Sequence, residues 1–273
     1  MTRDEESVLI NPIHDTYDHV TKSGWMEIVG SRTSDEECAR ADLEKTARFY
    51  DAAAARYDAE LEANAKDLVV RQAFRTRVSD AAGSGGLILD FGCGTGLDAL
   101  WYAEHGHRVV AYDLSSGMID HLRRRCRAQI ETRQIVPIAG SIDALIAELA
   151  RIGPVRVVAA NFAVLNHIRE LRPALRALAE HLTSGGTLMA NNLNPFYIHD
   201  MRQRWWWQGA VAGLWTGSIR FSGDVTTYRH LAGSIRRAAA PELDATEVIV
   251  PGGSGWKDKV WSNFVFITLR KRQ

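Results

Sequence analysis

The stretch that decides the fold is Leu87–Met118, which reads LILDFGCGTGLDALWYAEHGHRVVAYDLSSGM. It begins with a short apolar run bounded by glycines, and this pattern predicts a strand that is buried on both faces. Glycines follow at alternate positions, and apolar residues then recur at the spacing of one helical face. A second apolar run ends in Asp113. The order strand, glycine turn, helix, strand and acid predicts the first half of a nucleotide-binding βαβ unit.

The spacing of Gly92, Gly94 and Gly96 indicates the kind of nucleotide. A dinucleotide fingerprint runs G-x-G-x-x-G and rests a pyrophosphate on the helix N-terminus. Here the third glycine comes one position early, and Leu97 occupies the place of the fingerprint's last glycine. A G-x-G-x-G turn suits a nucleoside ligand without a pyrophosphate. Asp113 is then placed to accept two hydrogen bonds from a ribose diol.

At these residues the chain resembles a known family. Asp90–Gly96, DFGCGTG, is similar to motif I of the class I S-adenosylmethionine (SAM) methyltransferases, and Tyr112–Met118 is similar to the segment after their second strand. The resemblance implies an α/β, Rossmann-like sheet of seven mostly parallel strands, with an antiparallel last strand and helices on both faces. It also implies a SAM-dependent methyltransferase. A nicotinamide-dependent reductase is disfavoured by Leu97, and a non-catalytic regulator or partner subunit that binds SAM or its product is the alternative.

The resemblance assigns cofactor contacts to positions that match the family's motifs. Family members often carry Gly-Asp after the third strand, where this chain has Gly140-Ser141, so a backbone group near Ser141 is expected to meet the adenine. The expected cofactor-binding residues are Tyr50, Tyr57, Asp90, Gly92, Cys93, Gly94, Asp113, Leu114, Met118, Ser141, Ile142, Asn161 and Phe162.

Composition limits the remaining possibilities. The chain has 273 residues, of which 46% are hydrophobic, enough for one substantial core. Lys plus Arg equals Asp plus Glu at 33 each, so net charge does not favour nucleic acid. Three cysteines without a C-x-x-C spacing argue against disulfides and a metal site and favour a cytoplasmic protein. The longest apolar runs, 155–165 and 205–215, are too short to span a bilayer, so no stable membrane insertion is expected.

The chain divides into four predicted parts. Residues 1–80 form an N-terminal arm, whose role is left open, and lid helices; residues 81–193 form the SAM-binding core. Residues 194–230 form an inserted, tryptophan-rich cap after the fifth strand, with a hairpin predicted from Ile219–Phe221 and Val225–Tyr228, and residues 231–273 complete the sheet. Two helices are expected over Asp35–Val78, with Tyr50 and Tyr57 two turns apart on one helical face. Either Arg71 or Arg75 could meet the cofactor carboxylate, but a solvated helical face is favoured for both. A helix is also expected over Ser116–Gln129, the fourth strand over Val155–Ala160, and turns at Ser184–Gly186 and Gly252–Gly255.

Methyl transfer from SAM needs alignment of the acceptor, and a base only where the acceptor must lose a proton. His167, just past the fourth strand, is the first candidate base, and Tyr57 is a second catalytic candidate. A cap rich in tryptophan favours a small, partly apolar or aromatic acceptor, such as a secondary metabolite or a lipid-like molecule, methylated on O, N or C. The expected acceptor-binding residues are Trp205, Trp206, Trp207, Trp215 and Tyr228.

Two alternatives concern the cap. The tryptophans could instead form a dimer contact or a peripheral membrane contact, and the protein is expected to be a monomer or a homodimer. Asn194-Pro195-Phe196-Tyr197 imitates the motif of DNA amino-methyltransferases, but it follows the fifth strand rather than the fourth. No nucleic-acid partner is therefore expected.

Overall fold

The computed structural model describes residues 35–62, 64–251 and 260–272, and its centre is one seven-stranded sheet. The strand order is β3-β2-β1-β4-β5-β9-β8, with neighbouring strands parallel from β3 to β5 and β9 antiparallel to both β5 and β8. The strands are β1 (Leu87–Phe91), β2 (Arg108–Asp113), β3 (Ile135–Ala139), β4 (Val155–Ala160), β5 (Leu182–Leu193), β8 (Leu243–Ile249) and β9 (Phe264–Lys271). This confirms the predicted Rossmann-like sheet. Residues 1–34 and the turn predicted at 252–255 lie outside the described residues.

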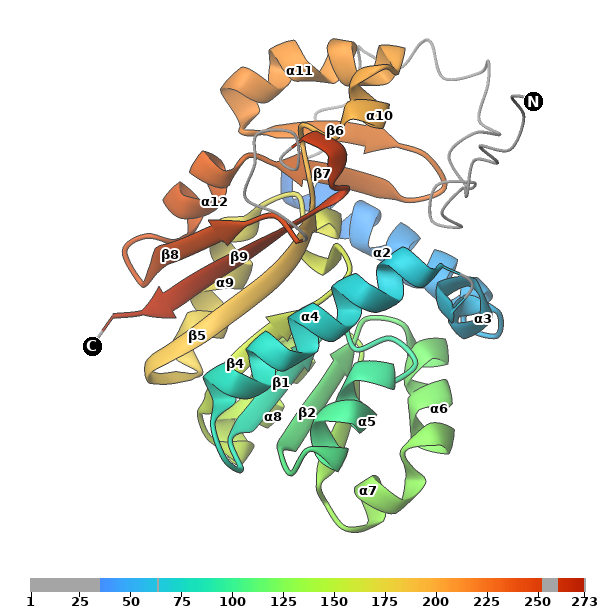
Figure 1. Ribbon diagram of the computed structural model, residues 1–273, viewed down its shortest axis with the longest axis vertical. Coiled ribbons are helices and arrows are strands. Elements are labelled where there is room, and N and C mark those ends of the chain that lie inside the picture. The colour runs from blue at the N-terminus through green and yellow to red at the C-terminus, as the bar shows by residue number, and fades with distance from the viewer. Residues whose placement is uncertain (1–34, 63, 252–259, 273) are drawn as a thin grey trace, which may run out of the picture.

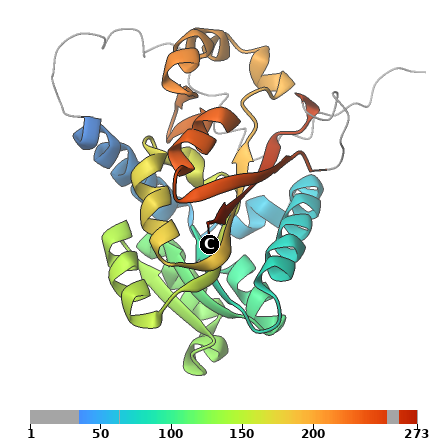
Figure 2. The ribbon, with the colours of Figure 1, turned by 90° about the vertical axis from the view of Figure 1, so that its left-hand side faces the viewer.

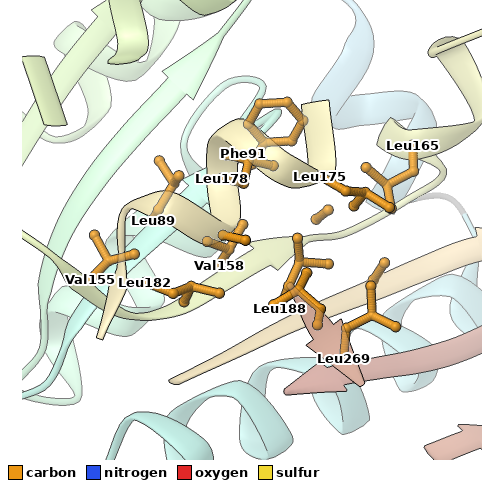
Figure 3. Packing of buried hydrophobic residues seen from close by; sticks show 14 of the residues in the cluster. Leu89, Phe91, Val155, Val158, Leu165, Leu175, Leu178, Leu182, Leu188 and Leu269 are labelled. Carbon is orange, nitrogen blue, oxygen red and sulfur yellow. The ribbon is translucent and has the colours of Figure 1, made fainter. Parts of the chain in front are cut away.

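Helices cover both faces of the sheet (Figures 1 and 2). Alternate strand residues point to opposite faces, so Ile88 packs with one helical layer and Leu89 with the other. One layer contains α4 (Ala65–Ala82), α5 (Leu97–Glu104) and α6 (Ser116–Arg125); the other contains α8 (Ile142–Ile152), α9 (Leu171–Glu180) and α12 (Ala232–Ala239). Figure 3 shows Leu175 and Leu178 of α9 close to the leucines and valines of the strands.

The cap is a separate unit beyond the carboxyl ends of the central strands (Figure 1). It consists of the short α10 (Ile198–Met201), α11 (Arg204–Thr216) and an antiparallel hairpin of β6 (Ser218–Ser222) and β7 (Thr226–His230). The helix lies very close to β6, because a Cβ added at Gly209 would come within 2.8 Å of Ile219. The predicted hairpin is thus confirmed, and the tryptophan-rich run before it is a helix.

The N-terminal segment differs from prediction. It forms three helices, α2 (Asp35–Ala53), α3 (Tyr57–Glu62) and α4, where two were expected. Tyr50 and Tyr57 therefore belong to different helices, and the prediction that they share one helical face is wrong. Contacts of Asp51 and Asp58 with the core, described below, fix the two helices separately and outweigh the helix propensity of the alanines between them.

Two smaller differences concern the core. The helix predicted over 116–129 is interrupted at Cys126, after which α7 (Arg127–Glu131) begins. The turn predicted at Ser184–Gly186 is part of the strand β5, whose pairing with β4 shifts register between Val155 and Val157. Beyond β4 a 3-10 turn, η1 (Val164–His167), leads toward α9.

Candidate cofactor- and acceptor-binding site

The glycine turn after β1 lies at the carboxyl ends of the parallel strands, where ligands bind in open α/β sheets. Gly92, Gly94 and Gly96 have φ values of +79°, +54° and +87°, a region that side-chain-bearing residues rarely adopt. The N–H groups of Gly92 and Cys93 donate to the Tyr112 carbonyl oxygen at 2.8 and 2.9 Å. The turn is thereby fixed against the end of β2.

Asp113 closes the opposite side of this turn. Its Oδ2 accepts from the Gly94 N–H at 2.8 Å, and its Oδ1 accepts from the Ser115 N–H at 2.9 Å. Burial raises the pKa of Asp113 to about 6. An ionised carboxylate has about four acceptor positions, so two are left for hydroxyl donors. The side chain thus joins the two predicted motifs and keeps the acceptor capacity that a ribose diol needs.

Beneath the turn lies a buried charged cluster centred on Asp98. The Asp98 Oδ1 accepts from the Arg75 Nε at 2.5 Å and lies 3.7 Å from the Arg71 Nε. Burial would raise the pKa of Asp98, but the two guanidinium groups outweigh burial and hold that pKa below its usual value. Both arginines are enclosed, so their predicted placement on a solvated helical face is wrong. A polar helical face does not reveal that an acid lies opposite it.

The same cluster holds two of the predicted cofactor-binding residues. Asn161 donates from Nδ2 to Asp98 Oδ2 at 2.8 Å, and its Oδ1 accepts from Asn191 Nδ2 at 2.9 Å. Both polar groups of the Asn161 side chain are therefore hydrogen-bonded within the protein, so a ligand would contact this residue through its backbone. Phe162 follows with a φ of +52° and lies under the Arg71 guanidinium at 4.8 Å. Asp98 was not among the predicted site residues, because its only signal in the sequence is one acid in an otherwise apolar first helical turn.

Helices α2 and α3 cover the glycine turn. Asp51 Oδ1 accepts from the Ser115 hydroxyl at 2.6 Å and from the Gly117 N–H at 2.8 Å. Asp58 accepts from the Thr95 hydroxyl and pairs with Arg125 at 2.5 Å. These contacts hold the two helices against the start of α6 and against the turn itself.

Tyr57 lies directly over the turn. A Cβ added at Gly94 would lie 3.6 Å from the Tyr57 ring, so a narrow gap separates the tyrosine from the glycine backbone. Burial raises the pKa of the Tyr57 hydroxyl far above its usual value. That hydroxyl stays protonated at neutral pH and cannot act as a phenolate base.

A cavity of about 100 Å³ opens beside this gap. Its walls come from the lid helices, the segment after β4, β5, β9 and the β6–β7 hairpin. The lining residues are Phe49, Tyr50, Ala53, Arg56, Tyr57, Glu60, Phe162, Ala163, His167, Leu193, Asp224, Val225, Thr227 and Phe264.

His167 and Tyr50 form a pair in the wall of this cavity. The Tyr50 hydroxyl lies 3.1 Å from His167 Nε2, and His167 Nδ1 lies 3.4 Å from the Thr226 carbonyl oxygen. A carbonyl oxygen can only accept, so the ring proton resides on Nδ1 and Nε2 accepts from the tyrosine. Burial lowers the pKa of His167 to about 4. The imidazole is therefore neutral at physiological pH, with its lone pair directed at Tyr50.

The residues predicted to bind the acceptor lie outside the cavity wall. Trp206 is buried and donates to the Pro195 carbonyl oxygen at 2.7 Å, and Trp205 packs edge-on against Phe221. Trp207 and Trp215 are 61% and 88% exposed. Tyr228 donates to Asp42 Oδ2 at 2.5 Å. Val225 and Thr227, on the other face of the hairpin, line the cavity instead.

Other predicted cofactor residues have local roles in the fold. Ser141 is the N-cap of α8, and its Oγ accepts from the Ala144 N–H at 3.3 Å. Ile142 and Met118 contribute to hydrophobic packing, Met118 at 1% exposure. Leu114 is partly buried beside Asp113. Burial raises the pKa of the Cys93 thiol well above its usual value, which makes the thiol unreactive.

The residues around the glycine turn fit SAM, a nucleoside that carries a sulfonium and an ammonium group. No side chain fills the space between Gly94 and the Tyr57 ring, and Asp113 offers free acceptor positions to a ribose. Asp90, at the end of β1, is 1% exposed, and its Oδ2 has no hydrogen-bond partner among the described residues. Burial, together with the nearby Asp98, raises its pKa well above the usual value. Bound positive charge would stabilise the ionised forms of these carboxyls.

Two further features bear on other ligand classes. No group of three or more His, Cys, Asp or Glu side chains among the described residues could hold a metal ion. Within the same residues, no helix is both long and apolar enough to cross a membrane.

Comparison with known proteins agrees with the geometry. Residues 88–186 match the family model described as a methyltransferase domain. The chain is 28% identical over 233 residues to the demethylmenaquinone methyltransferase of Thermobifida fusca, covering 83% of this chain and 94% of that protein. It is 32% identical over 118 residues to the tRNA 5-carboxymethoxyuridine methyltransferase of Escherichia coli, covering 42% of this chain and 43% of that protein.

A solved structure shares the fold over most of the chain. The 1,6-didemethyltoxoflavin-N1-methyltransferase of Burkholderia thailandensis, which holds its substrate and S-adenosylhomocysteine (SAH), superposes with a TM-score of 0.60. It is 14% identical to this chain, and the match covers 90% of this chain and 94% of that one.

The sheet order, the glycine turn and Asp113 define a Rossmann-like protein that binds a nucleoside cofactor. Together with the methyltransferase-domain match over residues 88–186 and the similarity to known methyltransferases, these features identify the chain as a SAM-dependent methyltransferase, as its motifs predicted. It is an enzyme, and SAM is its methyl donor.

Proposed function

We propose that this methyltransferase acts on an acidic hydroxyl group carried by an aromatic or quinol-like ring, which binds in the cavity between the lid helices and the β6–β7 hairpin. The observation that carries the proposal is the neutral pair of His167 and Tyr50 in the cavity wall. Bound SAM supplies an electrophilic methyl group. The protein has to align the acceptor, exclude water and accept a proton.

The size and lining of the cavity favour a single ring. An engineered cavity of about 150 Å³ lined by aliphatic and aromatic side chains binds benzene, and this cavity measures about 100 Å³. Phe49, Phe162 and Phe264 supply aromatic edges and faces to it. The Thermobifida fusca relative is named for demethylmenaquinone, a quinone, which also supports a ring-shaped acceptor.

The pKa of His167 favours an acidic hydroxyl over an aliphatic one. With a pKa of about 4, the imidazole is available at neutral pH but is a weak base. Moving a proton to it from a phenol, with a pKa of about 10, crosses about six units, or about 8 kcal/mol. From an aliphatic hydroxyl, with a pKa near that of water, the same transfer crosses about twelve units, or about 16 kcal/mol. Of these two proton transfers, only the one from the phenol has a free-energy cost low enough for an enzyme to lower the barrier readily.

The proton would leave the acceptor as the new bond forms. The acceptor hydroxyl donates to Tyr50 Oη, and Tyr50 passes its own proton to His167 Nε2, which becomes a transient imidazolium. The Thr226 carbonyl oxygen holds the Nδ1–H in place throughout and fixes the ring orientation. Both side chains line the cavity, so both are candidate catalytic residues.

The proposal is tested with His167→Ala, Tyr50→Phe and the matched control His105→Ala, at the C-cap of α5. Transfer of labelled methyl from SAM is measured with a phenol, an aliphatic alcohol and an amine that carry the same ring. We expect methylation of the phenol, a kcat lowered about 10²- to 10⁴-fold in the His167 variant, and wild-type SAH affinity in all variants. Full activity in His167→Ala, or methylation of the amine in preference to the phenol, would contradict the proposal.

A further inference from the structure

The outer face of α11 is apolar and exposed. Trp207, Val211, Leu214 and Trp215 recur at the spacing of one helical face and are 61%, 67%, 77% and 88% exposed. The inner face of the same helix packs on β6, where Gly213 is buried. Figures 1 and 2 place α11 at the outer edge of the molecule, on the side of the hairpin away from the large sheet.

The exposed area is large for a single helix. A tryptophan side chain buries about 200 Å² when fully covered, so Trp207 and Trp215 together present roughly 300 Å² of indole to solvent. Val211 and Leu214 extend this surface between them. The largest apolar patch on a typical soluble monomer covers about 300–600 Å² and is often functional, so this face is a candidate interaction surface.

The surroundings of the patch are positively charged. Between residues 201 and 217 the chain has two arginines, Arg202 and Arg204, and no Asp or Glu. Both arginines are exposed. The chain as a whole has equal numbers of basic and acidic residues, so this local surplus is a property of the cap.

We propose that the outer face of α11 docks on the surface of an anionic lipid bilayer. Exposed tryptophans beside arginines, on a helix that lies along the surface, match the chemistry of the boundary between headgroups and acyl chains. The indoles and Leu214 enter that boundary, and the arginines meet the anionic headgroups. The inference goes beyond the proposed methyl transfer and does not depend on it.

A second copy of the chain is the main competing occupant. In a two-fold symmetric contact the same patch occurs on both sides, so the interface would carry Arg202 and Arg204 twice, with no acidic residue from the same segment to offset them. Like charges brought together at an interface cost free energy, whereas an anionic surface attracts them. One helical face also offers less area than the roughly 800 Å² per partner of a standard protein interface.

The test is co-sedimentation of the full chain with phosphatidylcholine vesicles, with and without phosphatidylglycerol. We expect binding to the anionic vesicles that weakens as salt is raised, with a blue shift of tryptophan emission. Leu214→Glu should lower the partition coefficient at least about tenfold, since it places a charge where the exposed leucine would enter the bilayer. Arg204→Glu should lower it by a smaller factor. Val69→Glu, at a residue that is 71% exposed on α4, is the matched control and should bind as the wild type does.

SAH binding by calorimetry verifies that each variant is folded, and light scattering reports its oligomeric state. Two results would overturn the proposal: no sedimentation with anionic vesicles, or sedimentation that Leu214→Glu leaves unchanged. A dimer that Leu214→Glu dissociates would assign the face to a second copy and would overturn it as well.

Discussion

Alanine substitutions in the glycine turn separate its structural role from its role in binding the cofactor. Gly92 and Gly94 both have positive φ, but their surroundings differ. A Cβ added at Gly92 would lie 2.4 Å from a methyl carbon of Val164, whereas one added at Gly94 would meet only the Tyr57 ring at 3.6 Å. The first contact is impossible without movement, and the second is an ordinary van der Waals distance.

The expected magnitudes follow from these distances. A side chain in left-handed backbone costs about 1–2 kcal/mol at either position. Gly92→Ala adds overpacking against the stiff Val164 side chain, about 1–3 kcal/mol more. At about 3 °C per kcal/mol for a chain of this size, Gly94→Ala should lower Tm by about 3–6 °C and Gly92→Ala by about 6–15 °C. In Gly94→Ala the methyl group fills the gap under Tyr57, and the resulting 1–3 kcal/mol weakens SAH binding about 5- to 150-fold.

Thermal unfolding and calorimetry with SAH measure the two effects separately. Gly106→Ala is the control, because Gly106 also has positive φ but open space around it. It should lose stability to a similar extent as Gly94→Ala and keep wild-type SAH affinity. Adding Val164→Ala to Gly92→Ala should restore part of the lost stability, as a double-mutant cycle would detect. Wild-type SAH affinity in Gly94→Ala would refute the placement of the cofactor in this gap.

Three further predictions concern binding and stability. SAH affinity should be about tenfold weaker at pH 5 than at pH 8, and it should be constant above pH 7. The reason is that the Asp113 carboxyl, with a pKa of about 6, is mostly protonated at pH 5 and then loses acceptor capacity. Calorimetry across this pH range measures the affinity, and an affinity independent of pH would contradict the prediction. Leu145→Ala, at a fully buried position, should lower the free energy of unfolding by about 2–5 kcal/mol, and Leu145→Met by less than about 1.5 kcal/mol, as denaturant titration will measure. Asp58→Asn should weaken the contacts with Arg125 and Thr95 by about 1–3 kcal/mol, which hydrogen exchange would detect as faster exchange in α3; unchanged protection would show that these contacts do not hold the helix.

The sequence predicted the central sheet well because its strands are buried on both faces. The bounds predicted for β4, Val155–Ala160, are those of the structure, since six residues rich in valine and alanine between turn residues fit a buried parallel strand. The glycine turn and Asp113 were predicted together for a related reason. Gly92 and Gly94 adopt positive φ, which favours glycine, so the backbone conformation of the turn leaves a recognisable glycine pattern in the sequence.

What the sequence did not predict depends on contacts between distant segments. The break between α2 and α3 is set by Asp51 and Asp58, whose partners lie more than thirty residues away in the chain. The enclosure of Arg71 depends on Asp98, which the helical pattern of α4 does not reveal. The cap tryptophans were predicted to surround the acceptor, but periodicity alone does not say which face of a helix meets the hairpin. Whether the predicted residues bind the cofactor and acceptor stays a prediction until the variants are measured.

Helix α2 joins the two halves of the site physically. Its Asp42 accepts from the Thr226 and Tyr228 hydroxyls of the hairpin, its Lys45 donates to the Gly223 carbonyl oxygen at 2.7 Å, and its Asp51 holds the start of α6. A swing of this helix that uncovers the glycine turn therefore breaks its bonds to the hairpin as well. The contacts of α2 thus couple the cofactor site to the acceptor cavity, and release of the demethylated cofactor by this route would uncover the acceptor cavity as well.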